Sequence, residues 1–337
     1  MKKKNFLFNV VIFFAIIFSL EIIARVFHLA DLAGISKNLL IFEKNIHTNS
    51  PNAEAIVFSK KTFIDEFGFR VPKKDFNYNE RKSSILIIGD SVSFGVGVEE
   101  ENSFIGKLRN EFRNLNFLNS SVSGYHLKHY PEIIKRNKNI DSIKEVIFFY
   151  TLNDISFQQS VVNWEKQIEE NENVENTDFF NKLKKNRYFA KINSFLRSKS
   201  VFYMWFKGIV SKPSERYFYY IYSIYQNNSA IKELNEEFIK LRKIVNEKNF
   251  KLTIIILPYE YQTRKENCSN GLLQPQNIVK DILINLKIKF KDYTKIFCDY
   301  ERPNFLFLKF DPVHLSYAGH KLVFDLLKKD LNYLENQ

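Results

Sequence analysis

The run Ile85-Leu-Ile-Ile-Gly89-Asp90-Ser91 decides the fold of this chain. Four consecutive apolar residues, three of them β-branched, are typical of a strand buried on both faces of a sheet. Glycine, aspartate and serine follow directly and therefore lie at the carboxyl end of that strand, the edge at which open α/β sheets bind ligands. We expect Ser91 to present its hydroxyl to solvent there, with its own N–H pointing into the same crevice.

The segments after this run alternate between apolar strands and amphipathic helices, which predicts a parallel sheet covered on both faces. Strands are predicted at residues 85–88, 116–118, 146–150 and 252–257, with a weaker one at 295–297. Helices are predicted at residues 103–114, 231–249, 276–289 and 317–331. Residues 30–80 show no sustained period, so we expect a loop-like linker and lead-in segment before a domain at 81–335.

A long insertion separates the third and fourth predicted strands, because about 100 residues are far more than a crossover requires. The insertion, at 155–228, contains a charged loop at 165–178 and aromatic-rich helical segments at 188–206 and 217–225. One interpretation is a helical insertion packed on the core. The other is a lid over the site or an amphipathic surface near a membrane.

A possible general base lies far downstream, in Asp311-Pro-Val-His314. Proline restrains the turn, and the spacing of three residues lets the carboxylate reach and orient the imidazole. Serine is a weak nucleophile until such a base removes its proton. The sequence therefore predicts a catalytic triad of Ser91, His314 and Asp311.

Two further polar segments follow predicted strands at the same edge of the sheet. Residues 119–124 follow the second strand, and residues 151–154 follow the third. A glycine N–H and an asparagine amide are suitable donors for the oxyanion of a tetrahedral intermediate. We therefore expect Gly124, Asn153 and the N–H of Ser91 to form an oxyanion hole.

In this order the segments resemble the SGNH (GDSL-type) hydrolase family. Its four blocks are matched by Gly89-Asp90-Ser91, by Gly124, by Asn153, and by Asp311 with His314. Two positions depart from the family pattern: Val92 replaces the usual leucine, and Thr151 replaces the glycine of the Gly-x-Asn-Asp block. The second departure leaves the donor Asn153 in place but puts the shape of that loop in doubt.

The resemblance, which covers residues 85–330, implies a flavodoxin-like three-layer α/β/α sandwich with a parallel sheet. It implies no metal or organic cofactor. The stretch Phe67-Gly-Phe-Arg70, together with the apolar N-terminus, is also similar to the membrane-anchored bacterial branch of the family. That second match is much less specific.

The N-terminus predicts a transmembrane helix over residues 1–29. Three lysines precede an apolar run from Phe6 to Leu20, which reaches the length of a span, about 20 residues, if Asn9 is tolerated and Glu21 sits at the far interface. A cleaved signal peptide fits the same start, but no small-x-small cleavage site follows the run. We expect an uncleaved signal anchor, with the rest of the chain outside the cytoplasm by the positive-inside rule.

Charge and cysteine content exclude some functions. The net charge is +12, but the basic residues are spread along the chain and interleaved with acidic ones, so nucleic-acid binding is not expected. The two cysteines, Cys268 and Cys298, are too few for a zinc site. They either form a disulfide in an oxidising compartment or remain free thiols.

These features together predict a membrane-anchored, outward-facing serine esterase. Its substrate is expected to be an ester-bearing small molecule or an acetylated carbohydrate, with acetyl as the leading acyl group. Glu260, Tyr261 and Gln262 follow the fourth strand and are candidate substrate-binding residues, with an ordinary polar loop as the alternative. An O-acyltransferase with the same triad, and a non-catalytic binding or assembly protein on the same fold, are the competing functions.

Overall fold

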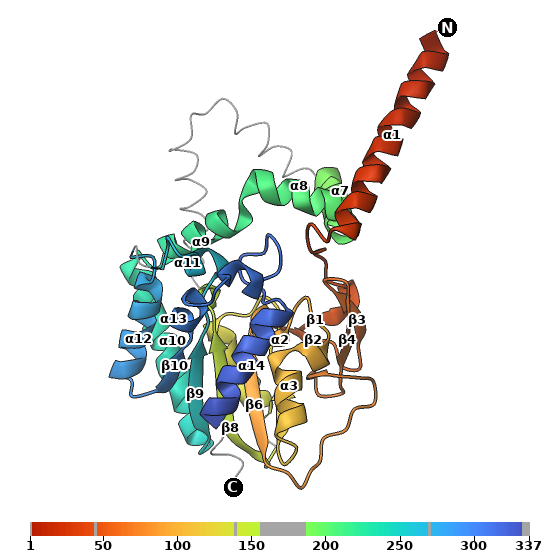
Figure 1. Ribbon diagram of the computed structural model, residues 1–337. Helices are drawn as coiled ribbons and strands as arrows, with labels where there is room; N and C mark the ends of the chain where they lie inside the picture. Colours follow the sequence, from red (N-terminus) through yellow and green to blue (C-terminus); the bar gives the residue numbers. More distant parts are fainter. Residues whose placement is uncertain (1, 44–45, 138–139, 156–186, 269–270, 332–337) are drawn as a thin grey trace.

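An eight-stranded mixed sheet forms the centre of the fold (Figure 1). The computed structural model describes residues 2–43, 46–137, 140–155, 187–268 and 271–331. Five strands run parallel in the order β10-β9-β8-β6-β7. Their bounds are β6 (Ser84–Gly89), β7 (Asn116–Asn119), β8 (Ile143–Tyr150), β9 (Lys251–Ile256) and β10 (Lys289–Asp292). In chain order this is the flavodoxin-like arrangement 2-1-3-4-5, as the resemblance implies.

Helices cover both faces of this sheet, which confirms the three-layer α/β/α fold. On one face α3 (Phe104–Glu111) packs beside α14 (Tyr317–Leu331), and both lie in front of the sheet in Figure 1. The other face carries α4 (Tyr130–Arg136), α10 (Asn228–Glu247) and α12 (Gln274–Asn285). Helices α3, α10, α12 and α14 and strands β6 to β9 correspond to the predicted elements, with ends that differ by a few residues, whereas α4 was not predicted.

The expectation of a loop-like segment at residues 30–80 is wrong. Strands β3 (Glu54–Val57), β4 (Lys60–Ile64) and β5 (Arg70–Val71) extend the sheet beyond β7 in antiparallel fashion, and β1 (Leu40–Glu43) pairs with β2 (Ile46–Asn49) in a separate hairpin. These strands hold two to five residues each. Because β3 alternates between exposed and buried residues over only four positions, its period is too short to stand out in the sequence.

The weaker strand predicted at 295–297 is also wrong. That segment lies in the short helix α13 (Thr294–Cys298), and the edge strand is β10, six residues earlier at its start. Strand β10 has the sequence Lys-Phe-Lys-Asp, in which three of the four residues are charged. Charged side chains are typical of a strand at the edge of a sheet, where one side of the strand faces water. Phe297 and Cys298 are buried, but they lie in a helical turn. A short apolar run in the sequence does not distinguish a buried helical turn from a buried strand.

Within the insertion, the structure describes α7 (Arg187–Lys199), α8 (Val201–Ser211) and α9 (Pro213–Ile224). Helix α9 packs on the core through Phe218 and Ile221, which agrees with a packed helical insertion. Helices α7 and α8 lie at the foot of the projecting helix α1 (Lys2–Val26), away from the core (Figure 1). The charged loop predicted at 165–178 lies outside the described residues.

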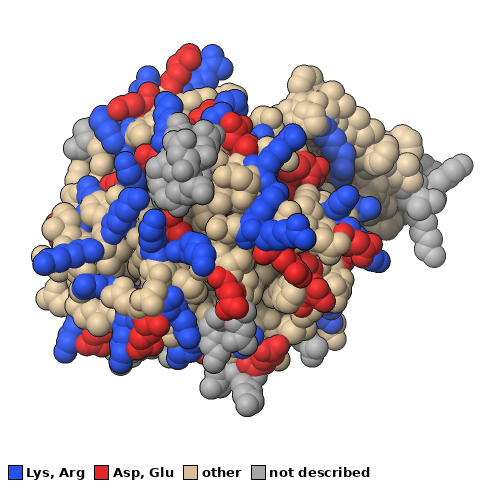
Figure 2. All heavy atoms as spheres, turned by 90° about the horizontal axis from the view of Figure 1, so that it is seen from below, with Lys and Arg blue, Asp and Glu red and all other residues tan. Residues whose placement is uncertain are grey.

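One face of the molecule carries a mixture of basic and acidic side chains. Figure 2 shows Lys and Arg interspersed with Asp and Glu across the underside of the molecule.

The two cysteines form a disulfide, Cys268–Cys298, with a Cα–Cα separation of 6.2 Å. It ties the loop after α11 (Glu260–Thr263) to the end of α13. Of the two alternatives for the cysteines, the structure has the paired one.

Candidate active site

A chain of hydrogen bonds joins the three residues predicted as a triad. Ser91 begins the short helix α2 (Ser91–Phe94) directly after β6. Its Oγ lies 2.9 Å from Nε2 of His314, and Nδ1 of His314 lies 2.7 Å from Oδ2 of Asp311. The other carboxylate oxygen of Asp311 accepts the backbone N–H groups of Val313 (2.9 Å) and His314 (2.8 Å). One carboxylate therefore both shapes the turn and orients the imidazole.

The electrostatics of this pair suit a general base. Burial by itself lowers the pKa of His314, but the charge of Asp311 and its hydrogen bond outweigh burial and raise that pKa above 6.5. Burial raises the pKa of Asp311, and the interactions with His314 and two backbone N–H groups lower it below the ordinary value of 3.8. Asp311 is therefore ionised at neutral pH, and its charge favours a protonated imidazole at His314.

Asp90 connects the nucleophile to the third-strand loop. It is fully buried, and its Oδ1 caps α2 by accepting the N–H of Val92 at 2.8 Å. Its Oδ2 accepts from the Asn153 amide (2.9 Å) and from the Thr151 hydroxyl (2.9 Å). This carboxylate therefore fixes the relative positions of Ser91, which it precedes, and Asn153.

The departure at Thr151 has a structural explanation. The backbone there is extended, with φ −118° and ψ 159°, a conformation that does not require glycine. The side chain is buried and uses its hydroxyl to reach Asp90. Thr151 therefore adds a contact to the loop and does not displace Asn153.

The Asn153 side chain is held in an orientation that leaves one donor for substrate. Its Oδ1 accepts from the hydroxyl of the buried Tyr259 at 2.7 Å, and one N–H goes to Asp90. A side-chain amide carries two N–H donors, so the second N–H is available for an oxyanion. Sequence reasoning missed Tyr259, since a lone tyrosine after a strand carries no signal of this role.

Gly124 lies on the loop after β7, beside the nucleophile loop. Val122 donates its N–H to the Gly89 carbonyl at 3.1 Å, which holds the two loops together. Gly124 has φ +84°, a left-handed conformation that favours glycine. His47 of β2 supports the loop, with Nε2 2.9 Å from the Ser123 carbonyl. His47 was also missed, because it lies in the segment expected to be a loop.

Phe58 is a third residue that the sequence did not reveal. It occupies the tip of the β3–β4 hairpin, and its ring meets the His314 ring edge to face, with centroids 5.3 Å apart. The tip residues Phe58 and Ser59 have φ +46° and +66°, as in a two-residue turn with both central residues left-handed. The hairpin therefore covers the His314 imidazole with an aromatic ring.

Arg70 supports the nucleophile loop from behind. Its buried guanidinium donates to the carbonyls of Phe94 (2.5 Å), Gly95 (2.6 Å) and Val98 (2.6 Å). These carbonyls lie at the carboxyl end of α2 and in the loop that follows it. The cation therefore satisfies carbonyls that have no partner within so short a helix. This contact gives Arg70, the last residue of the Phe67-Gly-Phe-Arg70 stretch, a structural role.

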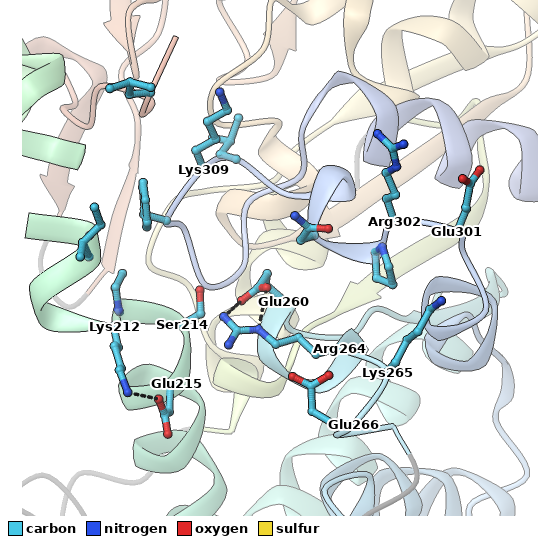
Figure 3. A pocket seen from close by; sticks show the side chains of 18 residues that line it. Lys212, Ser214, Glu215, Glu260, Arg264, Lys265, Glu266, Glu301, Arg302 and Lys309 are labelled. Atoms are coloured by element: carbon cyan, nitrogen blue, oxygen red, sulfur yellow. Dashed lines mark hydrogen bonds and ion pairs between the residues drawn. The ribbon is translucent and has the colours of Figure 1, made fainter. Parts of the chain in front are cut away.

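The candidate substrate-binding residues do not act as one group. Glu260 lines a cavity of 800 Å³ and faces Arg264, with Oε1–Nε and Oε2–Nη2 separations of 3.0 and 2.9 Å (Figure 3). Tyr261 packs against Phe218 beside that cavity. Gln262 is fully buried and exchanges hydrogen bonds with Gln276, so it supports the loop and does not face solvent.

A second cavity, of 590 Å³, adjoins the catalytic loop. It shares Gly208 and Phe310 with the first cavity. Phe58, Tyr217 and Asp311 line it together with residues of α8. An apolar wall thus extends from the base-covering ring toward α8 and α9.

Comparison with known proteins supplies the family. A family model described as GDSL-like lipase/acylhydrolase matches residues 85–327. Similar solved structures include a lipase/acylhydrolase from Enterococcus faecalis, with 12% identity over 74% of this chain and 95% of that one and a TM-score of 0.42. Another is the psychrotrophic esterase EstA from a Pseudoalteromonas species, with 11% identity over 76% of this chain and 100% of that one and a TM-score of 0.41.

An acetyl xylan esterase, AlAXEase, is similar at 13% identity over 74% of this chain and 99% of that one, with a TM-score of 0.42. No curated protein sequence matches the chain. The family model covers more than half of the residues and includes Ser91, Gly124, Asn153, Asp311 and His314. The chain therefore belongs to the GDSL-like lipase/acylhydrolase family.

Proposed function

We propose that this protein hydrolyses acyl esters with Ser91 as nucleophile, His314 as general base and Asp311 as the residue that orients it. The observation that carries the proposal is the unbroken line of hydrogen bonds from Ser91 Oγ through the imidazole to Asp311. Membership of an ester-hydrolysing family supports the reaction class. A non-catalytic role on this fold would not require that alignment.

The reaction follows from these positions. Ser91 Oγ attacks the acyl carbon while its proton passes to His314 Nε2, and the carbonyl oxygen becomes an oxyanion. We assign its stabilisation to the N–H groups of Ser91 and Gly124 and to the second N–H of the Asn153 amide. His314 then protonates the departing alcohol, and a water molecule activated by the same imidazole releases the acid from the acyl-enzyme.

We propose an extracytoplasmic carbohydrate ester or another small ester as substrate, with acetyl as the first acyl group to test. His126 and His129 lie next to the oxyanion loop, and His126 Nδ1 is 2.8 Å from the Asn153 carbonyl. Burial, with the neighbouring His126, lowers the pKa of His129 to about 4, so its ring is neutral at neutral pH. Neutral imidazoles are suitable partners for sugar hydroxyls.

We also propose that α1 remains attached as a membrane anchor. Residues Phe8–Val26 are long and apolar enough to cross a membrane. The last turns of α1 belong to the folded domain: Glu21 accepts from the N–H groups of Val201 and Phe202 at 3.0 Å each, and Ala24 is fully buried. Cleavage of a signal peptide near this point would remove these contacts. The disulfide agrees with an oxidising, extracytoplasmic location.

The decisive experiment uses the full chain in detergent micelles, with p-nitrophenyl esters of increasing acyl length and acetylated glycans as substrates. Ser91→Ala and His314→Ala should abolish turnover, whereas Ser93→Ala, a change at the buried neighbouring serine, should not. A fluorophosphonate probe should add to Ser91, as located by mass spectrometry. Turnover that survives both triad substitutions would refute the mechanism.

A second readout separates hydrolysis from transfer. Acetate released in the presence of an added sugar acceptor indicates a hydrolase, and acetylated acceptor indicates an O-acyltransferase that uses the same triad. The acyl-enzyme is common to both, so only the fate of the acyl group distinguishes them.

A further inference from the structure

We infer that α7 and α8 form a membrane-contact surface that lies flat on an anionic phospholipid bilayer. The surface is defined by exposed apolar side chains on two consecutive helices: Tyr188, Ile192 and Phe195 on α7, and Phe206, Ile209 and Val210 on α8. The inference rests on the proposed anchoring of α1, because that helix brings the surface to the bilayer.

Helix α8 has two distinct faces. Val201 and Gly208 point inward, and a Cβ placed on Gly208 would collide with the ring of Phe310. On the outer face Phe206, Ile209 and Val210 are 55%, 51% and 68% exposed. Residues 206, 209 and 210 lie on one side of a helix with 3.6 residues per turn. On this face Phe206 contacts the ring of Phe202 in the same helix, and Ile209 also borders the 800 Å³ cavity, so most of the apolar area of these three side chains is left exposed to solvent.

Helix α7 repeats the pattern. Tyr188, Ile192 and Phe195 recur at intervals of four and three residues, and each is more than half exposed. Exposed apolar side chains scattered singly are normal on protein surfaces, but a continuous group over two neighbouring helices marks an interaction site.

The charges of this segment indicate the kind of partner. Residues 187–212 contain no Asp or Glu, although acidic residues are interleaved with basic ones elsewhere. The basic residues of the same stretch are Arg187, Lys191, Arg197, Lys199, Lys207 and Lys212. Aromatic and aliphatic residues on one face, combined with Lys and Arg and no carboxylates, are typical of helices that lie in the interface of anionic membranes.

The position of the surface indicates the same partner. Glu21 of α1 caps the N-terminus of α8, with the Ser200 hydroxyl 2.7 Å from its carboxylate, and Arg25 donates to the Lys199 carbonyl at 2.5 Å. The two contacts join the end of the apolar span to the α7–α8 junction. Figure 1 shows α8 running crosswise at the foot of α1, the orientation of a helix that lies along the membrane plane. The exposed apolar surface is therefore continuous with the span.

The consequence concerns the active site. Met204, Lys207 and Gly208 of α8 line the 590 Å³ cavity that Asp311 and Phe58 also line. A bilayer against the outer face of α8 would hold this cavity one helix away from the lipid headgroups.

The test uses the full chain in nanodiscs, with single cysteines that carry the fluorophore NBD. The native cysteines form a disulfide and do not react under non-reducing conditions. Phe206→Cys, Val210→Cys and Ile192→Cys report on the surface. Phe13→Cys reports on the span, and Ile284→Cys on α12 is an exposed control, 60% exposed in the structure.

In nanodiscs that contain phosphatidylglycerol, NBD at 206, 210 and 192 should show blue-shifted emission, quenching by doxyl lipids and loss of quenching by iodide. The label at 284 should behave in the opposite way. Replacing Lys191 and Lys199 together by Glu should reduce the doxyl quenching, as should nanodiscs of phosphatidylcholine alone.

Two results would overturn the inference and leave the proposed anchor intact. In the first, iodide quenches the labels at 206 and 210 as strongly as the label at 284. In the second, the labels at 206 and 210 are protected from both iodide and doxyl lipids, which would indicate burial against protein. In each case the label at 13 would still be quenched by doxyl lipids. If the label at 13 is also exposed to iodide, the proposed anchoring fails as well.

Discussion

Oδ2 of Asp90 accepts a hydrogen bond from the side-chain amide of Asn153 at 2.9 Å, across the crevice between the first and third strands of the parallel sheet. The residue before Ser91 thus holds the side chain of Asn153. Because Asp90 also caps the helix that Ser91 begins, one buried carboxylate fixes the proposed nucleophile and the proposed oxyanion donor relative to each other.

Replacing Asp90 by Asn should lower kcat by about tenfold or more and reduce the free energy of unfolding by about 1–3 kcal/mol, because buried donors of Thr151 and Asn153 would lose their acceptor. Ester turnover and urea unfolding measure the two effects. Asp141→Asn, a matched change at an exposed position, should alter neither. Wild-type kcat in Asp90→Asn would contradict the positioning role.

Removing the Asn153 amide should lower kcat by about 10²–10³ and leave KM nearly unchanged, since the donor acts on charge that develops in the transition state. Steady-state kinetics of Asn153→Ala test this, with Asn110→Ala on the exposed surface of α3 as the control. A rise in KM without loss of kcat would assign Asn153 to ground-state binding instead.

The acid limb of the pH profile should lie above pH 6.5. His314 must be neutral to accept the serine proton, and Asp311 raises its pKa, so activity appears as pH rises through that raised value. Asp311→Asn removes the raising interaction; the limb should move to lower pH, and kcat should fall by as much as about 10⁴. A limb that stays in place in Asp311→Asn would show that it reports another group.

Phe58→Gly should lower kcat while changing the stability of the fold little. Loss of the ring exposes the imidazole to water, but glycine relaxes the left-handed turn, which offsets much of the lost packing. Ser59→Gly provides the matched control, because it relaxes the neighbouring turn residue and its side chain is exposed. Equal kcat in the two variants would exclude a role for the ring.

Removing the disulfide should lower the free energy of unfolding by about 3.6 kcal/mol, the value expected for a closed loop of this size. The sequence separation of Cys268 and Cys298 is 30 residues. Guanidinium unfolding of the Cys268→Ser, Cys298→Ser double variant measures the loss, and kcat should stay close to that of the parent, since neither cysteine lies among the residues around Ser91. Unchanged stability would mean that the bridge does not restrict the unfolded chain enough to stabilise the fold.

The sequence by itself determined the parallel core and the blocks that meet at its carboxyl edge. Long apolar runs such as residues 85–88 are buried on both faces, and that burial produces a pattern strong enough to recognise without any neighbour. Ser91 and Asn153 follow such strands within three residues, and Gly124 lies on the loop after β7, so their common edge is a consequence of strand direction. The Asp311–His314 turn is local, and its spacing of three residues is visible in the sequence.

Only the tertiary structure decided what supports these residues. His47, Phe58 and Arg70 come from short strands whose pairing depends on partners distant in the chain, so their patterns carry little local signal. Tyr259 and Thr151 act through side-chain hydrogen bonds, which have no periodicity. The junction of Glu21 with α8 joins residues about 180 positions apart, and such a contact exists only once the chain has folded.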